Sequence, residues 1–131
     1  VDLLPKPAAF PAFGPAPKAY RIRRLRSLNA QPAVLAEIWL DGDQAAQLST
    51  SELSHSLYLY YRNVLKLRIT EAEDRLGLEP VPQWAPDGFE PTPGTPCLFA
   101  ARLSRSQTGE TVEYSQNWID TNVARYVARI K

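Results

Sequence analysis

Apolar and polar side chains alternate with a period of two residues along most of this chain. The pattern is clearest in residues 20–28, where Tyr20, Ile22, Arg24 and Arg26 share one face. Extended patterns recur in five further segments, namely residues 33–41, 66–78, 97–104, 110–118 and 123–131. Period two is the repeat of a β-strand, and turn-forming stretches separate several of these segments. The sequence therefore predicts a largely antiparallel β-sheet.

One segment between the second and third strands has helical spacing instead. Apolar residues from Leu53 to about Leu65 recur on one helical face. Ser49 and Glu52 offer a capping box at the start of this helix. The predicted order is β-β-α-β-β-β-β, which places the chain in the α+β class, with an antiparallel sheet and a helix packed on it. A slip in the apolar parity near residues 71–74 also predicts a β-bulge.

Proline is concentrated in two stretches. Of the 12 prolines, five lie in residues 1–19 and six lie in residues 79–96. A proline fixes φ and removes a hydrogen-bond donor, so we expect an extended linker over the first stretch and an irregular loop over the second. Phe10 and Phe13 in the first stretch are candidates for packing on a neighbouring surface. The remaining residues 20–131 are long enough to form one domain with its own core.

The charge balance and the single cysteine limit the function classes. The chain has 15 Lys and Arg residues against 14 Asp and Glu residues, which predicts no broad basic surface for nucleic acid. As the only cysteine, Cys97 excludes an internal disulfide and favours a reducing compartment, so we expect a cytoplasmic protein. No apolar run approaches about 20 residues, so no membrane span is predicted. The chain contains no Met and begins with Val1, so we expect a fragment of a longer protein or a processed chain.

Two arginines and one polar strand face are the best candidates for a binding site. Arg24 and Arg26 share their strand face with apolar residues, and a buried guanidinium matches a carboxylate or a phosphate. A solvent-exposed face with solubilising arginines is the equal alternative. On a later strand, Glu113, Ser115 and Asn117 share one face, which indicates either a solvated face or a polar pocket. In a pocket, the glutamate would accept hydrogen bonds from a ligand or orient the arginines.

The helix start and the second strand hold further candidates. Ser54, Ser56 and nearby backbone N–H groups could hold an anion, although serines at such positions more commonly cap the helix. His55 has no second His and no Cys at metal-ligand spacing, so we expect no metal and no cofactor. Glu37, close to Trp39, is another candidate for the pocket wall. The sequence has no catalytic motif: it lacks a G-x-S-x-G elbow, a P-loop and an H-E-x-x-H pair.

Five short motifs, in this order along the chain, resemble one family of bacterial regulatory domains. None of them is specific alone, but their order and spacing agree with the family over residues 20–131. The motifs are Arg24-Leu25-Arg26 with Gln31-Pro32, Glu37-Ile38-Trp39-Leu40, Ser56-Leu57-Tyr58, Pro96 to Arg102, and Gly109-x-x-Val112-Glu113-Tyr114-Ser115. Together they are similar to the UTRA effector-binding domain of GntR-type transcription regulators of the HutC subfamily.

The resemblance implies a fold, a role and a set of partners. The fold would be similar to that of chorismate lyase, an antiparallel sheet with flanking helices around a small-molecule pocket. The role would be that of a non-enzymatic effector sensor in a transcriptional repressor. A small and often anionic ligand would change the geometry of a homodimer. Operator DNA would be held by an N-terminal winged helix-turn-helix domain, which is absent from this chain.

The resemblance also implies pocket residues. The matching positions are Arg24, Arg26, Glu37, Ser56, Tyr58, Glu113, Ser115 and Trp118. The spacing after Pro32 is one residue longer than the common pattern, which leaves Ala36 and Glu37 as alternatives for one position. Alternation places Trp118 on the opposite strand face from Glu113, which favours packing or the dimer interface as its role.

Two other functions are compatible with the same residues. A chorismate-lyase-like enzyme would also place arginine and glutamate around an aromatic carboxylate. A domain that has lost its ligand would serve only as a dimer interface. Release of pyruvate from chorismate would identify the enzyme. A stable dimer whose melting temperature no anionic metabolite shifts would identify the interface domain.

Overall fold

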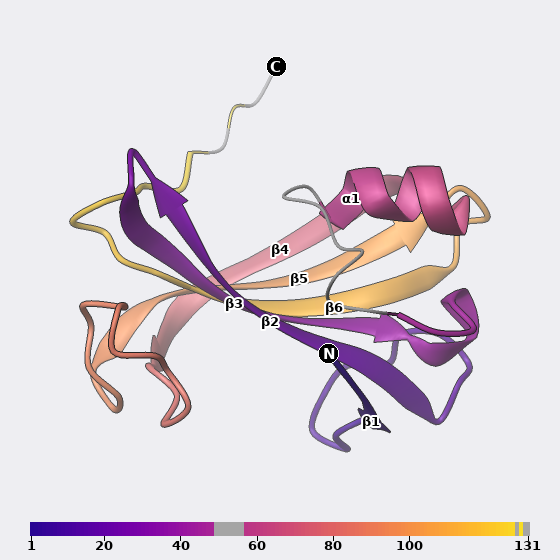
Figure 1. The fold of residues 1–131 in the computed structure, drawn as a ribbon, viewed down its shortest axis with the longest axis horizontal. Coiled ribbons are helices and arrows are strands. Elements are labelled where there is room, and N and C mark those ends of the chain that lie inside the picture. The colour runs from indigo at the N-terminus through magenta and orange to yellow at the C-terminus, as the bar shows by residue number, and fades with distance from the viewer. Residues whose placement is uncertain (49–56, 128, 130–131) are drawn as a thin grey trace.

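A single antiparallel sheet forms the centre of the structure (Figure 1). The computed structural model describes residues 1–48, 57–127 and 129. Within them, the sheet has six strands in the order β1-β2-β3-β6-β5-β4. The strands are β1 (Asp2–Pro5), β2 (Lys18–Leu28), β3 (Gln31–Asp41), β4 (Ile69–Pro80), β5 (Pro96–Ser106) and β6 (Thr111–Ile119). This sheet, with a helix packed on it, confirms the predicted α+β class.

The strand order divides the sheet into two three-stranded halves, β1-β2-β3 and β6-β5-β4. In each half, strands that follow one another along the chain pair antiparallel. The halves meet where β3 pairs with β6, with Ile38 opposite Ser115. In the β2–β3 hairpin, Asn29 and Ala30 both have a positive φ, of 51° and 65°. A two-residue turn of this kind matches the twist of the strands, and it joins the two strands predicted over residues 20–28 and 33–41.

The described part of the chain has one short α-helix, α1 (Leu57–Tyr60), which continues into a π-helical segment, η3 (Tyr61–Leu65). The end of this segment agrees with the predicted helix limit. Lys66 closes it in a left-handed conformation, with φ of 56°. The predicted capping box over residues 49–52 lies outside the described residues. A short 3-10 helix, η1 (Gly42–Gln44), follows the end of β3.

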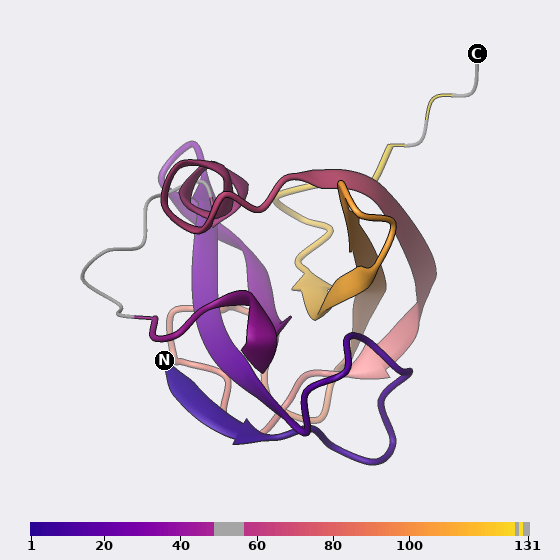
Figure 2. The ribbon, with the colours of Figure 1, turned by 90° about the vertical axis from the view of Figure 1, so that its right-hand side faces the viewer.

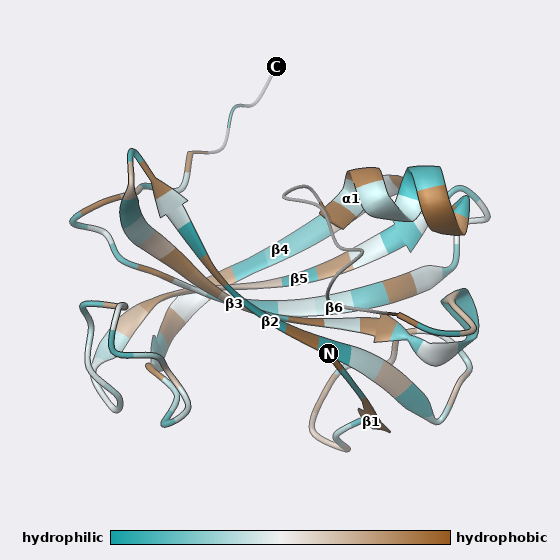
Figure 3. Cartoon of the chain, viewed as in Figure 1, coloured by the Kyte–Doolittle hydropathy of each residue, from teal (hydrophilic) through white to brown (hydrophobic). Residues whose placement is uncertain are grey.

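Different parts of the chain cover the two faces of the sheet (Figure 2). The helix packs on one face, named here the helix face, where Leu57 and Tyr61 join a core that includes Leu40. The two proline-rich stretches cover the opposite face, named here the loop face. Phe13 of the first stretch and Phe89 of the second are buried there. The bands of apolar and polar residues along the strands in Figure 3 reflect the alternation seen in the sequence.

Residues 1–19 belong to the folded domain. β1 pairs antiparallel with β2. The centroid of the Phe10 ring lies 5.4 Å from that of Trp39 and 4.8 Å from that of Tyr114. The predicted packing of the phenylalanines is confirmed, and the segment is more than a linker. Proline is tolerated here because an edge strand needs hydrogen bonds on one side only.

A buried ion pair ties this segment to the sheet. Lys6 Nζ pairs with Oδ1 of Asp41, the last residue of β3, and also donates to the backbone carbonyl of Phe13. Asp41 is 0% exposed, and the same oxygen accepts a hydrogen bond from the backbone N–H of Ala16 at 3.1 Å. Gly14 has φ of +67°, and a Cβ atom on it would lie 2.2 Å from Cγ of Asp41. The close approach of the backbone to this carboxylate therefore requires glycine.

The β6-β5-β4 half contains two irregularities. In β4 the register shifts between Ile69 and Glu71, just before the parity slip predicted for residues 71–74. In the β5–β6 pair the register shifts after Ser104, which lies opposite Glu113. Bulges of this kind increase the local twist and change the direction of side chains.

The predicted final strand over residues 123–131 is wrong for its described part. After β6 the chain turns at Asp120, whose backbone carbonyl accepts hydrogen bonds from the N–H groups of Val123 and Ala124. Residues 124–127 are not in a strand. β6 already pairs with β3 on one side and with β5 on the other, so it offers no free edge to this tail. Alternating apolar and polar residues form a strand only where a neighbouring strand is available to pair with them.

Candidate functional site

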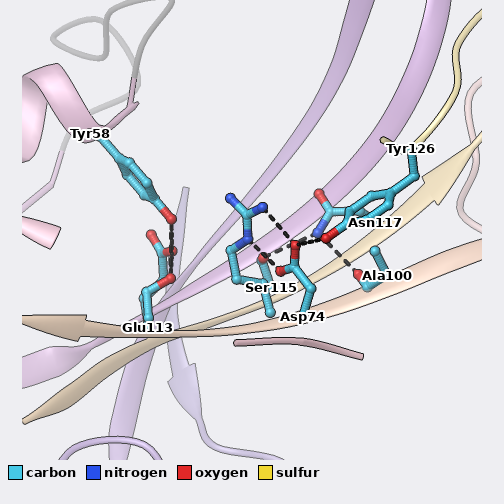
Figure 4. A network of polar contacts seen from close by, with 9 residues as sticks. Tyr58, Asp74, Ala100, Glu113, Ser115, Asn117 and Tyr126 are labelled. Carbon is cyan, nitrogen blue, oxygen red and sulfur yellow. Dashed lines mark hydrogen bonds and ion pairs between the residues drawn. The ribbon is translucent and has the colours of Figure 1, made fainter. Parts of the chain in front are cut away.

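The helix face contains a cavity of about 290 Å³. Side chains from β2, β3, β4, β5 and β6 line it, together with Leu57 and Tyr58 of the helix and Tyr126 of the C-terminal tail. Every strand except β1 therefore contributes to its wall. This volume is close to the lower end of the range for small-molecule sites. Figure 4 shows the polar groups in and around the cavity.

Arg24 and Arg26 form the basic side of the cavity. They are two residues apart on β2, so they lie on the same face of the sheet. Burial lowers the pKa of the Arg24 guanidinium, and the positive charge of Arg26 lowers it further. A negative group placed between two guanidinium groups would relieve their repulsion and could accept hydrogen bonds from both. This side of the cavity therefore suits an anion.

Arg102 belongs to the other half of the sheet and forms a bidentate ion pair with Asp74. Its Nε and Nη2 atoms donate to the two carboxylate oxygens at 2.6 and 2.9 Å. This hydrogen bonding lowers the pKa of Asp74 and raises the pKa of Arg102. The Tyr126 hydroxyl donates to Oδ2 of Asp74 at 2.8 Å, which holds the C-terminal tail at the cavity (Figure 4). The charge of Arg102 is therefore balanced within the site.

Glu113 is the buried carboxylate of the site, with an exposure of 2%. It accepts hydrogen bonds from the hydroxyl groups of Tyr61 at 2.6 Å, Ser104 at 3.1 Å and Tyr58 at 3.4 Å. Burial raises the pKa of Glu113 above its ordinary value, although these three donors act in the opposite direction. A carboxyl group with a raised pKa keeps its proton to a higher pH.

Ser115 and Asn117 add neutral polar groups to the cavity wall. The side-chain amide of Asn117 donates to the Ser115 hydroxyl at 3.1 Å and to the carbonyl of Ala100 at 3.2 Å (Figure 4). Hydroxyl and amide groups both donate and accept hydrogen bonds, so they suit ligand hydroxyl or amide groups. The site thus combines a basic side with a neutral polar side.

The structure brings together five of the eight predicted site residues. Those that line the cavity are Arg24, Arg26, Tyr58, Glu113 and Ser115. Their shared position favours a pocket over a solvated strand face. Ser56 lies outside the described residues. A role of these side chains in ligand binding stays a prediction.

Glu37 and Trp118 do not line the cavity, and both assignments are corrected. Glu37 lies on the loop face, where its carboxylate accepts hydrogen bonds from Arg23 Nε at 2.9 Å and from Trp39 Nε1 at 2.8 Å. Its neighbour Ala36 lines the cavity instead, as strand alternation requires. Trp118 is also on the loop face, where it is part of the buried core.

The sequence reasoning missed Asp74, Arg102, Ser104 and Tyr126. Asp74 and Arg102 lie opposite one another on β4 and β5, and only the register of these strands reveals that pair. Strand alternation could have indicated two of these residues, because Arg102 and Ser104 are two residues apart and therefore share a strand face. Tyr126 was expected in a strand, and the described residues around it, 124–127, form none.

Other classes of site receive no support from the described residues. Within that part of the chain, no group of three or more His, Cys, Asp or Glu side chains could hold a metal ion. None of its helices is long and apolar enough to cross a membrane. Cys97 is buried, and its Sγ atom donates to the carbonyl of Ile119 at 3.1 Å. It is therefore a core residue.

The raised pKa of Glu113 predicts a specific dependence of stability on pH. A carboxyl group whose folded pKa exceeds its unfolded pKa contributes stability below the unfolded pKa, and this contribution is lost as the pH rises through the folded pKa. Glu113→Gln should remove this loss, so the stability of the variant relative to the wild type should increase as the pH rises above the ordinary pKa of a glutamate, about 4.3. Urea unfolding of both proteins at a series of pH values measures the difference. Glu90→Gln, at an exposed position, is the control. A constant difference between wild type and Glu113→Gln would contradict the prediction.

Comparison with known proteins identifies a family and a relative. The family model of the UTRA domain matches residues 9–125. The chain is 48% identical over 131 residues to the HTH-type transcriptional regulator SmoD of Agrobacterium fabrum, a match that covers 100% of this chain and 56% of that protein. The chain therefore spans little more than half the length of this curated relative.

Solved structures with the same fold agree with this match. The ligand-binding domain of a GntR-family transcriptional regulator from Bordetella bronchiseptica superposes with a TM-score of 0.77 at 20% identity, over 87% of this chain and 74% of that one. YydK from Bacillus subtilis gives a TM-score of 0.75 at 20% identity, over 87% of this chain and 50% of that one. At this identity the two structures support the fold alone. Taken with the family model, which matches most of the chain, they lead to one conclusion: this chain belongs to the UTRA domain family.

Proposed function

We propose that this domain is the effector-sensing and dimerisation part of a bacterial transcriptional repressor. A small anionic metabolite binds in the cavity of the helix face. Binding changes the geometry of a homodimer and thereby the DNA affinity of a winged helix-turn-helix domain elsewhere in the full-length protein. Such a regulator acts in the cytoplasm. The name of the relative, an HTH-type transcriptional regulator, supports this role.

The paired arginines are the observation that carries the proposal. Arg24 and Arg26 line one cavity from one strand. Arg102, on the other half of the sheet, lines the same cavity and pairs with Asp74. An anionic ligand group is the natural counter-charge for the β2 arginines, and two forked guanidinium groups favour a carboxylate, phosphate or similar oxyanion.

Effector sensing requires that the ligand distinguish two states of the dimer. A ligand shifts an equilibrium only by its difference in affinity for the two states, commonly about 1–3 kcal/mol of coupling. The cavity meets a structural condition for such coupling because its wall draws on both halves of the sheet. A ligand bound in the cavity can therefore affect both halves of the sheet.

Replacement of either cavity arginine should abolish ligand-induced stabilisation while the domain stays folded. In a thermal-shift screen of phosphorylated, carboxylated and sulfonated metabolites, a ligand at 100 times its Kd would stabilise the wild type by about 2.7 kcal/mol. Arg24→Ala and Arg26→Ala should lose this shift, because each removes half of the basic side. Isothermal titration with the metabolite found in the screen gives the affinities.

Arg21→Ala is the matched control for this experiment. Arg21 is on the same strand but on the loop face, where it pairs with Asp2. The control changes the net charge equally and should keep the ligand shift. If Arg24→Ala and Arg26→Ala bind the ligand as well as Arg21→Ala does, the cavity is not the effector site.

We further propose that the domain is not an enzyme. The family and the relative are regulators, and no observation in the cavity favours the chorismate-lyase-like alternative. Incubation of the domain with chorismate, followed by an assay for pyruvate, tests this point directly. Pyruvate release that depends on Arg24 would reverse it.

A further inference from the structure

β4 is an open edge of the sheet. Within the described residues it pairs with β5 only, so its other side carries backbone groups that are not used in the sheet. It runs for 12 residues, and all of them except Ile69 and Asp74 are exposed. The opposite edge, β1, is only four residues long. A long exposed edge is a template for another strand unless something covers it.

The apolar residues on this edge are unusually exposed for a small domain. Leu76 is 51% exposed and Leu78 is 72% exposed. Two residues apart on one strand, they lie on the same face of the sheet. Gly77 lies between them, and a Cβ atom on it would meet nothing within 4 Å. Neighbouring exposed leucines on an unpaired strand indicate a surface that a partner covers.

The charges on the same edge suit a second copy of the same strand. In an antiparallel pair of identical strands related by a two-fold axis at Gly77, Arg75 lies opposite Glu79 of the other copy. Leu76 then lies opposite Leu78, and the symmetry repeats both contacts. Each arginine meets a carboxylate and each leucine meets a leucine.

Registers with the axis nearer the start of β4 are less favourable. With the axis at Leu76, Glu73 would lie opposite Glu79 of the other copy. With the axis at Arg75, two arginines would lie opposite each other, and with the axis at Asp74, two aspartates would. Directly opposed like charges destabilise a strand pair. Among these four registers, the one centred on Gly77 alone avoids them.

We propose that β4 is the dimerisation seam of this domain. A second copy of the chain adds its own β4 antiparallel to the first, with the two-fold axis at Gly77, and the two sheets become one continuous sheet. The proposal rests on the homodimer of the proposed function and assigns its surface. The seam is distinct from the ligand cavity, although Asp74 of the same strand lines that cavity.

Sedimentation velocity of the 131-residue chain and its variants tests the seam. The wild type should be a dimer, and Leu78→Asp should weaken dimerisation at least about tenfold, because it places two buried carboxylates at the seam. Val64→Asp is the matched control, since Val64 is 55% exposed on the helix and away from β4. Circular dichroism checks that each variant is folded.

A charge exchange tests the register itself. Arg75→Glu alone and Glu79→Arg alone should each weaken the dimer about tenfold, because each creates two like-charge pairs at the seam. The double variant Arg75→Glu, Glu79→Arg should restore wild-type affinity. A role of Arg75 within its own chain predicts no such rescue, because its present partner is Glu73 at 3.2 Å, which would then face a glutamate.

Three outcomes would overturn the seam. They are a monomeric wild type, a Leu78→Asp dimer as tight as the Val64→Asp dimer, and a charge exchange without rescue. Ligand binding is measured separately, through the Arg24→Ala comparison. A chain that binds no metabolite but shows the rescue would refute the sensor and support the seam. A chain that binds its metabolite but dimerises through another surface would support the sensor and refute the seam.

Discussion

Asp41→Ala is expected to lower the free energy of unfolding by about 3–5 kcal/mol, because it breaks a buried ion pair and leaves one charge behind. Asp41 is 0% exposed, and the Lys6 side chain is 15% exposed. Without the carboxylate, the Lys6 ammonium group keeps only the backbone carbonyls of Phe13 and Gly14 as acceptors, and the N–H of Ala16 loses its acceptor. Urea unfolding followed by tryptophan fluorescence measures the loss.

An exposed aspartate nearby provides the control for this prediction. Asp43→Ala should change the free energy of unfolding by no more than about 0.5 kcal/mol. Lys6→Met combined with Asp41→Asn should cost less than the sum of the two single variants, because the charges stabilise one another. Additive costs would show that the ion pair is not the source of the effect.

Tyr61→Ala is expected to cost about 3–5 kcal/mol, as for other large aromatic residues in a core. Tyr61 is 0% exposed and packs in the core of the helix face. Its hydroxyl also donates the shortest hydrogen bond to Glu113, at 2.6 Å. The substitution therefore creates a cavity and removes a donor from a buried carboxylate. Thermal and urea unfolding both report the change.

Tyr61→Phe separates the two contributions. It keeps the ring and removes only the hydroxyl, so it should cost about 1.5–3 kcal/mol, the range for a hydrogen bond to a charged group. The loss of the ring then accounts for the remaining decrease in the free energy of unfolding of Tyr61→Ala. A Phe variant as unstable as the Ala variant would assign the whole effect to the hydroxyl. An Ala variant within about 1 kcal/mol of wild type would refute the prediction.

Much of the fold and the central part of the site could be predicted because both follow from alternation. Arg24 and Arg26 share a face, as do Glu113 and Ser115, and the structure brings these faces to one cavity. Alternation also showed that Trp118 lies on the opposite face from Glu113. Where the family resemblance suggested a pocket role for Trp118, the local geometry was the better guide.

The remaining features depend on partners that are distant in sequence. The pairing of Arg102 with Asp74 spans 28 residues, and that of Lys6 with Asp41 spans 35. Neither can be read from a local pattern, because each depends on the strand order and register. The tail after β6 shows the converse, since residues such as Tyr126 alternate although both sides of the preceding strand, β6, are already paired. A strand needs a partner as well as a pattern.

The division of the sheet into two halves has a mechanical consequence. Arg24 and Arg26 lie in one half, and Arg102 lies in the other. A ligand held from both sides would brace the β3–β6 junction and set the torsion angle between the halves. In such a torsion, β1 would move with the first half and the exposed β4 edge with the second. A small torsional change would then swing the N-terminal end of each domain about the two-fold axis, so that ligand occupancy is read out as a rotation.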